Sequence, residues 1–95
     1  MIVAELRIVP VGDSSSMGEV IAEATAAIRA HGVKHKVGPL GTTLEAERLD
    51  DILDAVKAAH SAAIGIAPRV LTELTLDQRT DKEETARTLT KVRKA

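Results

Sequence analysis

The feature that most constrains this chain is its complete lack of aromatic side chains: none of the 95 residues is Phe, Tyr or Trp. Its core must therefore be built from Ile, Leu, Val, Ala and the two Met residues. Burying such side chains contributes about 25 cal/mol per Å² of apolar surface, and small domains bury a smaller fraction of their surface than large ones. We therefore expect a single small domain over residues 1–95, with a modest stability that self-association would increase.

The first segment has the pattern of a β-strand, because apolar residues alternate with a mixed series along residues 2–9. The apolar series is Ile2, Ala4, Leu6 and Ile8, and the mixed series is Val3, Glu5, Arg7 and Val9. This period of two predicts a strand with one buried face. Pro10 is expected to end the strand.

Two later segments have the periodicity of helices. Residues 17–31 carry an apolar stripe, and Ser16 and Glu19 at the start of this segment have the spacing of a capping box. Gly32 is expected to end this helix, since glycine accepts the left-handed conformation of a helix cap. A stronger apolar stripe over residues 49–64 predicts a second, longer helix.

The order of the predicted elements defines the fold class. Further strands are expected over residues 33–40, 41–46 and 70–76, and a short C-terminal helix over residues 81–95. Two right-handed β-α-β crossovers then produce an α+β fold of ferredoxin-like β-α-β-β-α-β topology. This fold has a four-stranded antiparallel sheet with both helices on one face.

The other face of this predicted sheet is open, and its composition is unusual. Its expected members are Val3, Glu5, Arg7, Val9, Thr43, Glu45, Leu71, Glu73 and Thr75. This mixture is too apolar for a surface that only meets water and too charged for a core. The open face is therefore predicted to be a sheet-to-sheet interface or the floor of a ligand site.

Charge and cysteine content exclude several classes of partner. The net charge is −1, from 13 basic and 14 acidic residues, and no aromatic side chain is present to stack on bases, so no nucleic-acid partner is expected. The lack of cysteine excludes disulfides and fits a reducing compartment. No signal peptide or membrane-spanning run is recognisable. We therefore expect no membrane partner and a cytoplasmic location.

Few residues are arranged for catalysis or for metal binding. His31, His35 and His60 have no Asp or Glu at ligand spacing, and His31 fits the C-terminal end of a helix. No hydroxyl is paired with a base in the sequence. The chain is therefore predicted not to be an enzyme and to hold neither a cofactor nor a metal.

Candidate ligand-binding residues come from three places. Ser15 and Ser16 precede the first helix, whose N–H groups could hold a polar ligand group, although a helix cap is the first explanation. Thr42, Thr43 and Glu45 follow Gly41, and Thr43 and Glu45 project from one face of a strand, where a hydroxyl and a carboxylate could bind an aminopyrimidine or a cation. Ordinary surface polarity explains this segment equally well. The carboxylates of the open face add Glu5 and Glu73.

The chain resembles the small single-domain thiamine-binding-protein-like family, relatives of the two-repeat YkoF thiamine/hydroxymethylpyrimidine-binding proteins. The resemblance spans nearly the whole chain and rests on the order and spacing of short matches. These are Ile2 to Glu5, Pro10 to Gly12 with Ser15 and Ser16, Pro39 to Thr42 with Glu45, Ala58 to His60, Arg69 with Val70, and Asp77, Arg79, Asp81 and Lys82.

This resemblance implies binding of thiamine or its pyrimidine precursor without catalysis. It also implies homodimers or homotetramers formed through sheet faces, with a ligand site at a subunit interface. A structural or regulatory oligomerisation module without a ligand is the alternative. An enzyme is expected only if two subunits together assemble a site that is hidden in the order of the sequence.

Overall fold

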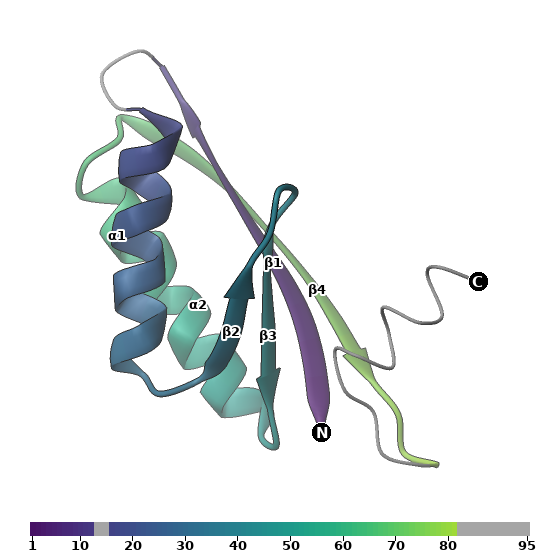
Figure 1. Ribbon diagram of the computed structural model, residues 1–95. Coiled ribbons are helices and arrows are strands. Elements are labelled where there is room, and N and C mark those ends of the chain that lie inside the picture. Colours follow the sequence, from purple (N-terminus) through teal and green to yellow (C-terminus); the bar gives the residue numbers. More distant parts are fainter. Residues whose placement is uncertain (13–15, 82–95) are drawn as a thin grey trace.

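The computed structural model describes residues 1–12 and 16–81 of the chain. In chain order its elements are β1 (Ile2–Val11), α1 (Met17–Ala30), β2 (Lys34–Val37), β3 (Thr42–Ala46), α2 (Leu49–Ile64) and β4 (Arg69–Gln78). Figure 1 shows this order along the chain. The predicted ferredoxin-like α+β fold is confirmed.

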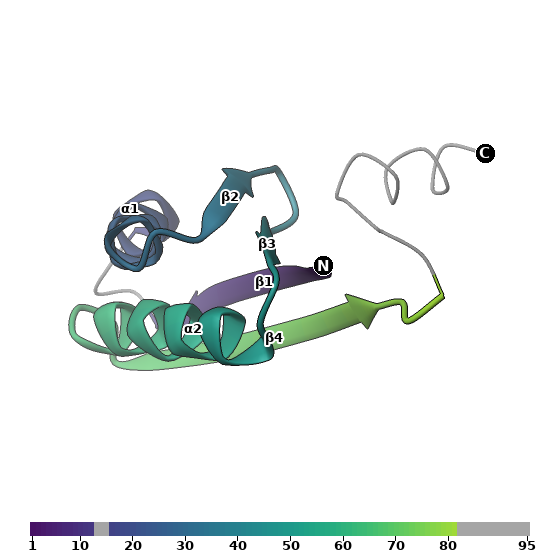
Figure 2. The same cartoon turned by 90° about the horizontal axis from the view of Figure 1, so that it is seen from below.

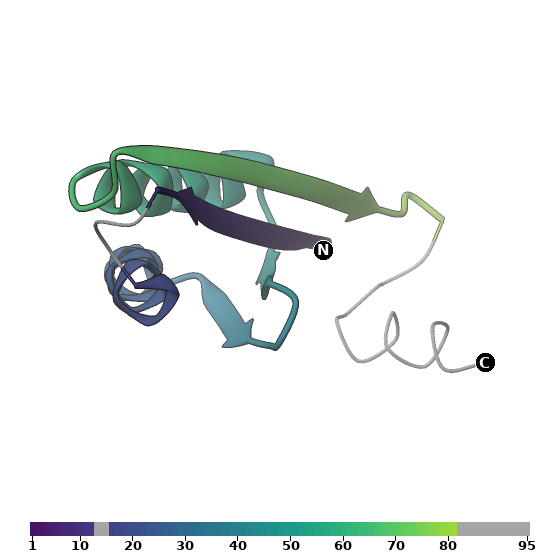
Figure 3. The same ribbon diagram turned by 90° about the horizontal axis from the view of Figure 1, so that it is seen from above.

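The four strands form one antiparallel sheet in the order β2-β3-β1-β4. β1 is the long central strand and pairs with β4 over its whole length, from Ile2 opposite Gln78 to Val11 opposite Arg69. On its other edge β1 pairs with β3 only as far as Leu6 opposite Thr42. Figures 2 and 3 show α1 and α2 side by side, covering one face of the sheet.

The core lies between this face and the two helices. Alternate residues of β1 point into it, as the period of two predicts. The larger cluster of buried apolar residues joins strand and helix side chains: Ile2, Ala4, Leu6, Ala24, Ile28, Val33, Leu44, Ile52, Ala55 and Ala59. Small alanines line the inner face of α2, which allows that helix to pack closely against its neighbours.

The two helices begin in different ways. Ser16 caps α1, because its side chain accepts a hydrogen bond from the Glu19 N–H at 3.1 Å. His31 is the C-terminal cap of α1, and Gly32 follows with a φ of +71°, so both ends of this helix were predicted correctly. Arg48 occupies the N-cap of α2 without a side-chain cap hydrogen bond. Neither α1 nor α2 has the length and apolar composition that crossing a membrane requires.

For three of the strands the predicted bounds were wrong, whereas β3 begins one residue later than predicted. β1 continues through Pro10 to Val11. Beyond Leu6 one edge of this strand has no neighbouring strand, and the missing N–H of Pro10 costs nothing on such an edge. β2 is limited to Lys34–Val37, since a turn closes with a 2.8 Å bond from the Gly38 N–H to the Gly41 carbonyl. β4 extends to Arg69–Gln78 because it pairs with all of β1. The helix predicted over residues 81–95 lies, except for Asp81, outside the described residues.

Candidate functional site

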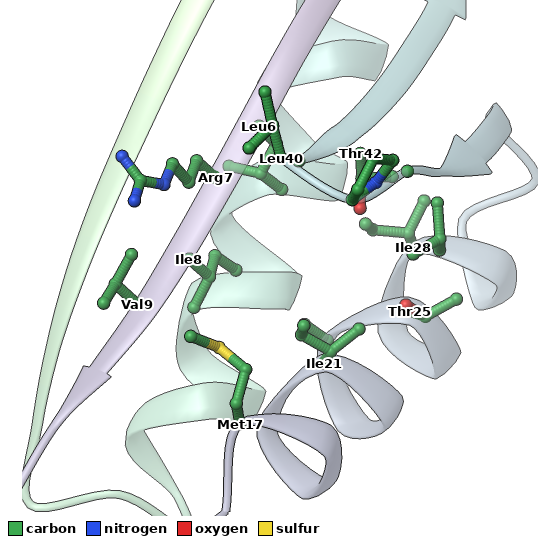
Figure 4. Close-up of a pocket in the computed structure, with 15 residues that line it drawn as sticks. Leu6, Arg7, Ile8, Val9, Met17, Ile21, Thr25, Ile28, Leu40 and Thr42 are labelled. Carbon is green, nitrogen blue, oxygen red and sulfur yellow. The ribbon is translucent and has the colours of Figure 1, made fainter.

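An apolar pocket lies between α1, β1 and the connection from β2 to β3 (Figure 4). Its volume is about 160 Å³. Side chains converge on it from several places, as Figure 4 shows: Leu6 and Ile8 from β1, Met17, Ile21, Thr25 and Ile28 from α1, Leu40 from the connection, and Thr42 from β3. None of these elements alone would form a concave site.

The pocket exists because β1 is longer than its partner β3. β3 stops opposite Leu6, and the face of α1 lies over the part of β1 that β3 leaves uncovered. Gly41 allows the close approach at this point, since a Cβ there would lie 3.0 Å from the Leu6 carbonyl oxygen. The chain turns back at residues 38–41, and this turn forms the remaining wall.

The polar groups of the pocket are few. Thr42 is 9% exposed, Thr25 is half-buried, and both contribute hydroxyls to the lining. None of the described lining residues carries a carboxylate, and Arg7 is the one charged residue among them. Met17 is 47% exposed and brings a polarizable thioether to the lining. The pocket therefore suits a flat, largely apolar ligand with a small number of hydrogen-bonding groups.

Among the predicted ligand-binding residues in the described part of the chain, only Thr42 lines this pocket. It pairs with Leu6, and the two share the helix-facing side of the sheet. Thr43 and Glu45 alternate with it and face the other way, as predicted for those two. Ser16 serves as the cap of α1, and Ser15 lies outside the described residues.

The open face has a second, shallower hollow of about 320 Å³. Glu5, Arg7, Glu73 and Thr75 line it together with Leu40, so the structure brings two of the predicted carboxylates together. The pairing explains this, since Glu5 lies opposite Thr75, and Arg7 lies opposite Glu73. The Arg7 guanidinium is 3.7 Å from the Glu73 carboxylate in an exposed ion pair, which adds little stability.

Glu45 lies apart from this hollow. Only 8% of it is exposed, and the Lys34 ammonium, itself 80% exposed at the side chain, lies 3.5 Å from its carboxylate. Val3, opposite Glu45 on the same face, is 1% exposed. Lys34 and Lys36 of β2 also belong to this face, opposite Glu45 and Thr43, and sequence reasoning did not include them.

The three histidines are used in the fold. His60 on α2 bonds through Nδ1 to the Thr72 hydroxyl of β4 at 2.6 Å, and His35 Nδ1 lies 2.9 Å from the Val33 carbonyl oxygen. His31 caps α1. Within residues 1–12 and 16–81, no three His, Cys, Asp or Glu side chains are grouped so that they could hold a metal ion.

Sequence reasoning missed most of the pocket. Thr25 carried a signal that could have indicated it, since this hydroxyl lies on the apolar stripe of α1 between Ile21 and Ile28. Leu40 carried another signal, because it is a large apolar residue within a Gly- and Pro-rich segment, and the structure leaves it 78% exposed. Neither signal reveals a cavity until the lengths of β1 and β3 are known.

The fold and this pocket define a class of protein: small ferredoxin-like α+β proteins with an apolar cavity beside an incompletely paired central strand. Comparison with known families identifies the particular family, since the model described as "Thiamine-binding protein" matches residues 4–94. The chain therefore belongs to the thiamine-binding protein family.

Relatives of known sequence and structure agree with this assignment. A UPF0045 protein of Methanothermobacter thermautotrophicus is 41% identical over 85 residues, which are 87% of this chain and 86% of that protein. The crystal structure of a hypothetical protein from Methanocaldococcus jannaschii has a TM-score of 0.86 at 34% identity, covering 98% of this chain and 95% of the other. A Thermotoga maritima protein with a suggested role in thiamine biosynthesis or salvage has a TM-score of 0.79 at 27% identity, covering 96% and 97%.

Proposed function

We propose that this protein binds thiamine or a related aminopyrimidine without changing it chemically, and that the pyrimidine ring occupies the apolar pocket. The family supports a ligand of this class. The similar Thermotoga maritima structure, with its suggested role in thiamine biosynthesis or salvage, points the same way.

The observation that carries this proposal is the size and lining of the pocket. An engineered protein cavity of about 150 Å³ takes up one benzene molecule, so a pocket of about 160 Å³ has room for one six-membered ring. Thr25 and Thr42 supply hydroxyls for its polar atoms. Met17 supplies a sulfur for contact with the ring face, which partly replaces the aromatic side chain that this chain lacks.

The charge of thiamine decides how it would be oriented. Because the described lining contains no carboxylate, a thiazolium ring inside the pocket would be an uncompensated cation. The pyrimidine is therefore the half that enters. Leu40 and Arg7 line both the pocket and the hollow of the open face. A thiazolium that leaves the pocket beside Leu40 therefore approaches Glu5 and also Glu73, whose carboxylate is paired with Arg7.

Binding without catalysis fits the pocket chemistry. Its described hydroxyls belong to Thr25 and Thr42, and no described Asp, Glu or His lines the pocket to act as a base. The cytoplasmic location remains a prediction from the sequence.

We also propose that a second copy of the chain packs against the open face, which would place the ligand site at a subunit interface. Val9 and Leu71 lie opposite each other there, and Leu71 is 46% exposed. Exposed apolar side chains beside charges of both signs favour a protein partner over water alone. A copy on this face would also contact Leu40 and narrow the mouth of the pocket.

The test uses two adjacent threonines that face opposite sides of β3. Thr42→Val removes a hydroxyl from the pocket, whereas Thr43→Val removes one from the open face. In titration calorimetry with thiamine and with hydroxymethylpyrimidine, Thr42→Val is expected to weaken binding about tenfold, the effect of about 1.4 kcal/mol for one lost hydrogen bond. Thr43→Val is expected to bind as the wild type does.

Glu45→Ala is a third variant in the same titrations and, like Thr43→Val, changes the open face, since Glu45 faces away from the pocket. A loss of affinity in Glu45→Ala and Thr43→Val, but not in Thr42→Val, would move the site to the open face. If the wild type releases no heat with either compound, the ligand proposal fails and the oligomerisation module takes its place.

A further inference from the structure

The part of β1 beyond Leu6 has a strand neighbour on one edge only. β4 accompanies β1 to Val11, whereas β3 stops opposite Leu6. Ile8 lies in this stretch and lines the pocket. The uncovered edge of β1 is therefore one wall of the pocket, and its backbone groups are available to a ligand there.

The direction of these backbone groups follows from Leu6. The Leu6 carbonyl oxygen lies 3.0 Å from where a Cβ on Gly41 would be, so this carbonyl points toward β3. In an antiparallel sheet the N–H and C=O of one residue point to the same edge, and the edge alternates from one residue to the next. Ile8, two residues after Leu6, therefore directs its N–H and its C=O toward the edge that β3 has left.

Among the described residues, neither polar group of Ile8 has a hydrogen-bond partner on this edge. Pro10, the next residue in the same series, has no N–H, so Ile8 holds the last donor on this edge before the strand ends at Val11. Backbone N–H and C=O groups that are buried away from water are nearly always paired in native proteins, and a ring that fills the pocket would bury those of Ile8. A ligand that supplies both an acceptor and a donor would complete this pairing.

We infer that the Ile8 backbone is the element that selects the ligand, and that it selects flat heterocycles with an amino group beside a ring nitrogen. The ring nitrogen accepts a hydrogen bond from the Ile8 N–H, and the amino group donates one to the Ile8 carbonyl. A 4-aminopyrimidine has this edge, and the two bonds fix the ring in the plane of the strand. The inference rests on the proposed function and adds to it the atoms that recognise the ring.

This assignment explains how a pocket with so few polar side chains can be selective. A backbone donor and acceptor on a paired strand are held rigidly, so no side-chain entropy is lost when they bind. Thr25 and Thr42 then lie beside the ring as secondary contacts, and Met17 lies near the mouth. The selectivity would survive side-chain changes that only alter the apolar lining.

The first test is backbone amide hydrogen exchange, measured by NMR with and without hydroxymethylpyrimidine. In the free protein the Ile8 amide is expected to exchange faster than the amides of Leu6, which faces β3, and Arg7, which faces β4. Saturation with hydroxymethylpyrimidine is expected to slow exchange at Ile8 about tenfold or more. The amides of Leu6 and Arg7 are the internal controls and are expected to change much less.

The second test compares analogues of the ligand on the wild-type protein. Replacing the 4-amino group of hydroxymethylpyrimidine by a methyl group keeps its size but removes the donor, and is expected to weaken binding about tenfold. The matched control keeps the amino group and lacks the 5-hydroxymethyl group. It is expected to lose less affinity than the 4-methyl compound.

The two proposals can fail separately. If hydroxymethylpyrimidine binds in a way that depends on Thr42, but exchange at Ile8 does not slow or the 4-methyl analogue binds equally well, the Ile8 inference is overturned and the proposed function stands. If no compound binds, both are overturned.

Discussion

At Gly41 the chain passes so close to β1 that no side chain fits without displacement. A Cβ at this position would lie 3.0 Å from the Leu6 carbonyl oxygen and 3.3 Å from Cγ of Glu5. The nearer of these atoms belongs to the backbone and cannot move aside without shifting β1. Gly41 therefore sets how closely the turn before β3 approaches the central strand, and with it the wall of the pocket.

Gly41→Ala is expected to lower the free energy of unfolding by about 1–3 kcal/mol, the usual cost of overpacking. Gly18 is the control, because a Cβ there would meet nothing nearer than the Ser16 Oγ at 4.0 Å. Since Gly18 lies within α1, Gly18→Ala is expected to raise the free energy of unfolding by about 0.5–1 kcal/mol. Urea denaturation measures both, and equal effects of the same sign would contradict this account.

At the scale of elements, strand periodicity and helix caps were predictable from the sequence, but the register between strands was not. Alternation correctly placed Glu5 and Thr43 on the open face, because the side chains of a strand alternate strictly. The start of β3 was predicted to within one residue, but its register, with Thr42 opposite Leu6, was not predictable, since it depends on a turn that closes between Gly38 and Gly41. The pocket follows from this register, and of the predicted ligand residues that the structure describes, Thr42 alone lines it.

The start of α2 offers a prediction at this scale. Arg48 has the extended backbone of an N-cap but makes no side-chain cap hydrogen bond, whereas Ser16 makes one for α1. Arg48→Asn is expected to raise the free energy of unfolding by about 1 kcal/mol, because asparagine is among the best N-cap residues. The exposed pair of Arg48 with Asp50, 3.6 Å apart, contributes little that would be lost.

Thermal or urea unfolding of Arg48→Asn measures this gain. Glu47→Asn places the same side chain one residue before the cap and is the control for position. It also removes the exposed 3.5 Å pair between Glu47 and the N-terminal ammonium, which contributes little. A gain of equal size in Glu47→Asn would show that capping is not the cause.

At the scale of the whole molecule, the two faces of the sheet have separate tasks. One face packs against α1 and α2 and has the pocket at its end, and the other carries Arg7, Glu73 and the exposed Leu71. Composition indicated that the open face is neither core nor plain surface. Composition could not indicate that the pocket opens beside this face. Leu40 lines both the pocket and the hollow of the open face, and only the folded β2–β3 turn places it there.

The proposed self-association is tested with two leucines of β4 that are about equally exposed. Leu71, 46% exposed, lies on the open face, and Leu76, 44% exposed, alternates to the helix side. Leu71→Lys is expected to weaken the oligomer at least tenfold, because a charge would be buried at the interface, whereas Leu76→Lys is expected to leave it unchanged. Sedimentation velocity over a concentration series measures this. A monomeric wild type, or an oligomer that survives Leu71→Lys, would exclude this face as the interface.

The absence of aromatic side chains also has a spectroscopic consequence. Because the whole chain lacks Phe, Tyr and Trp, the protein is nearly transparent in the near ultraviolet. A pyrimidine absorbs there and would acquire circular dichroism once the asymmetric walls of the pocket hold it in one orientation. Occupancy of this site can therefore be followed through the ligand's own absorption band, without a label and without a background signal from the protein.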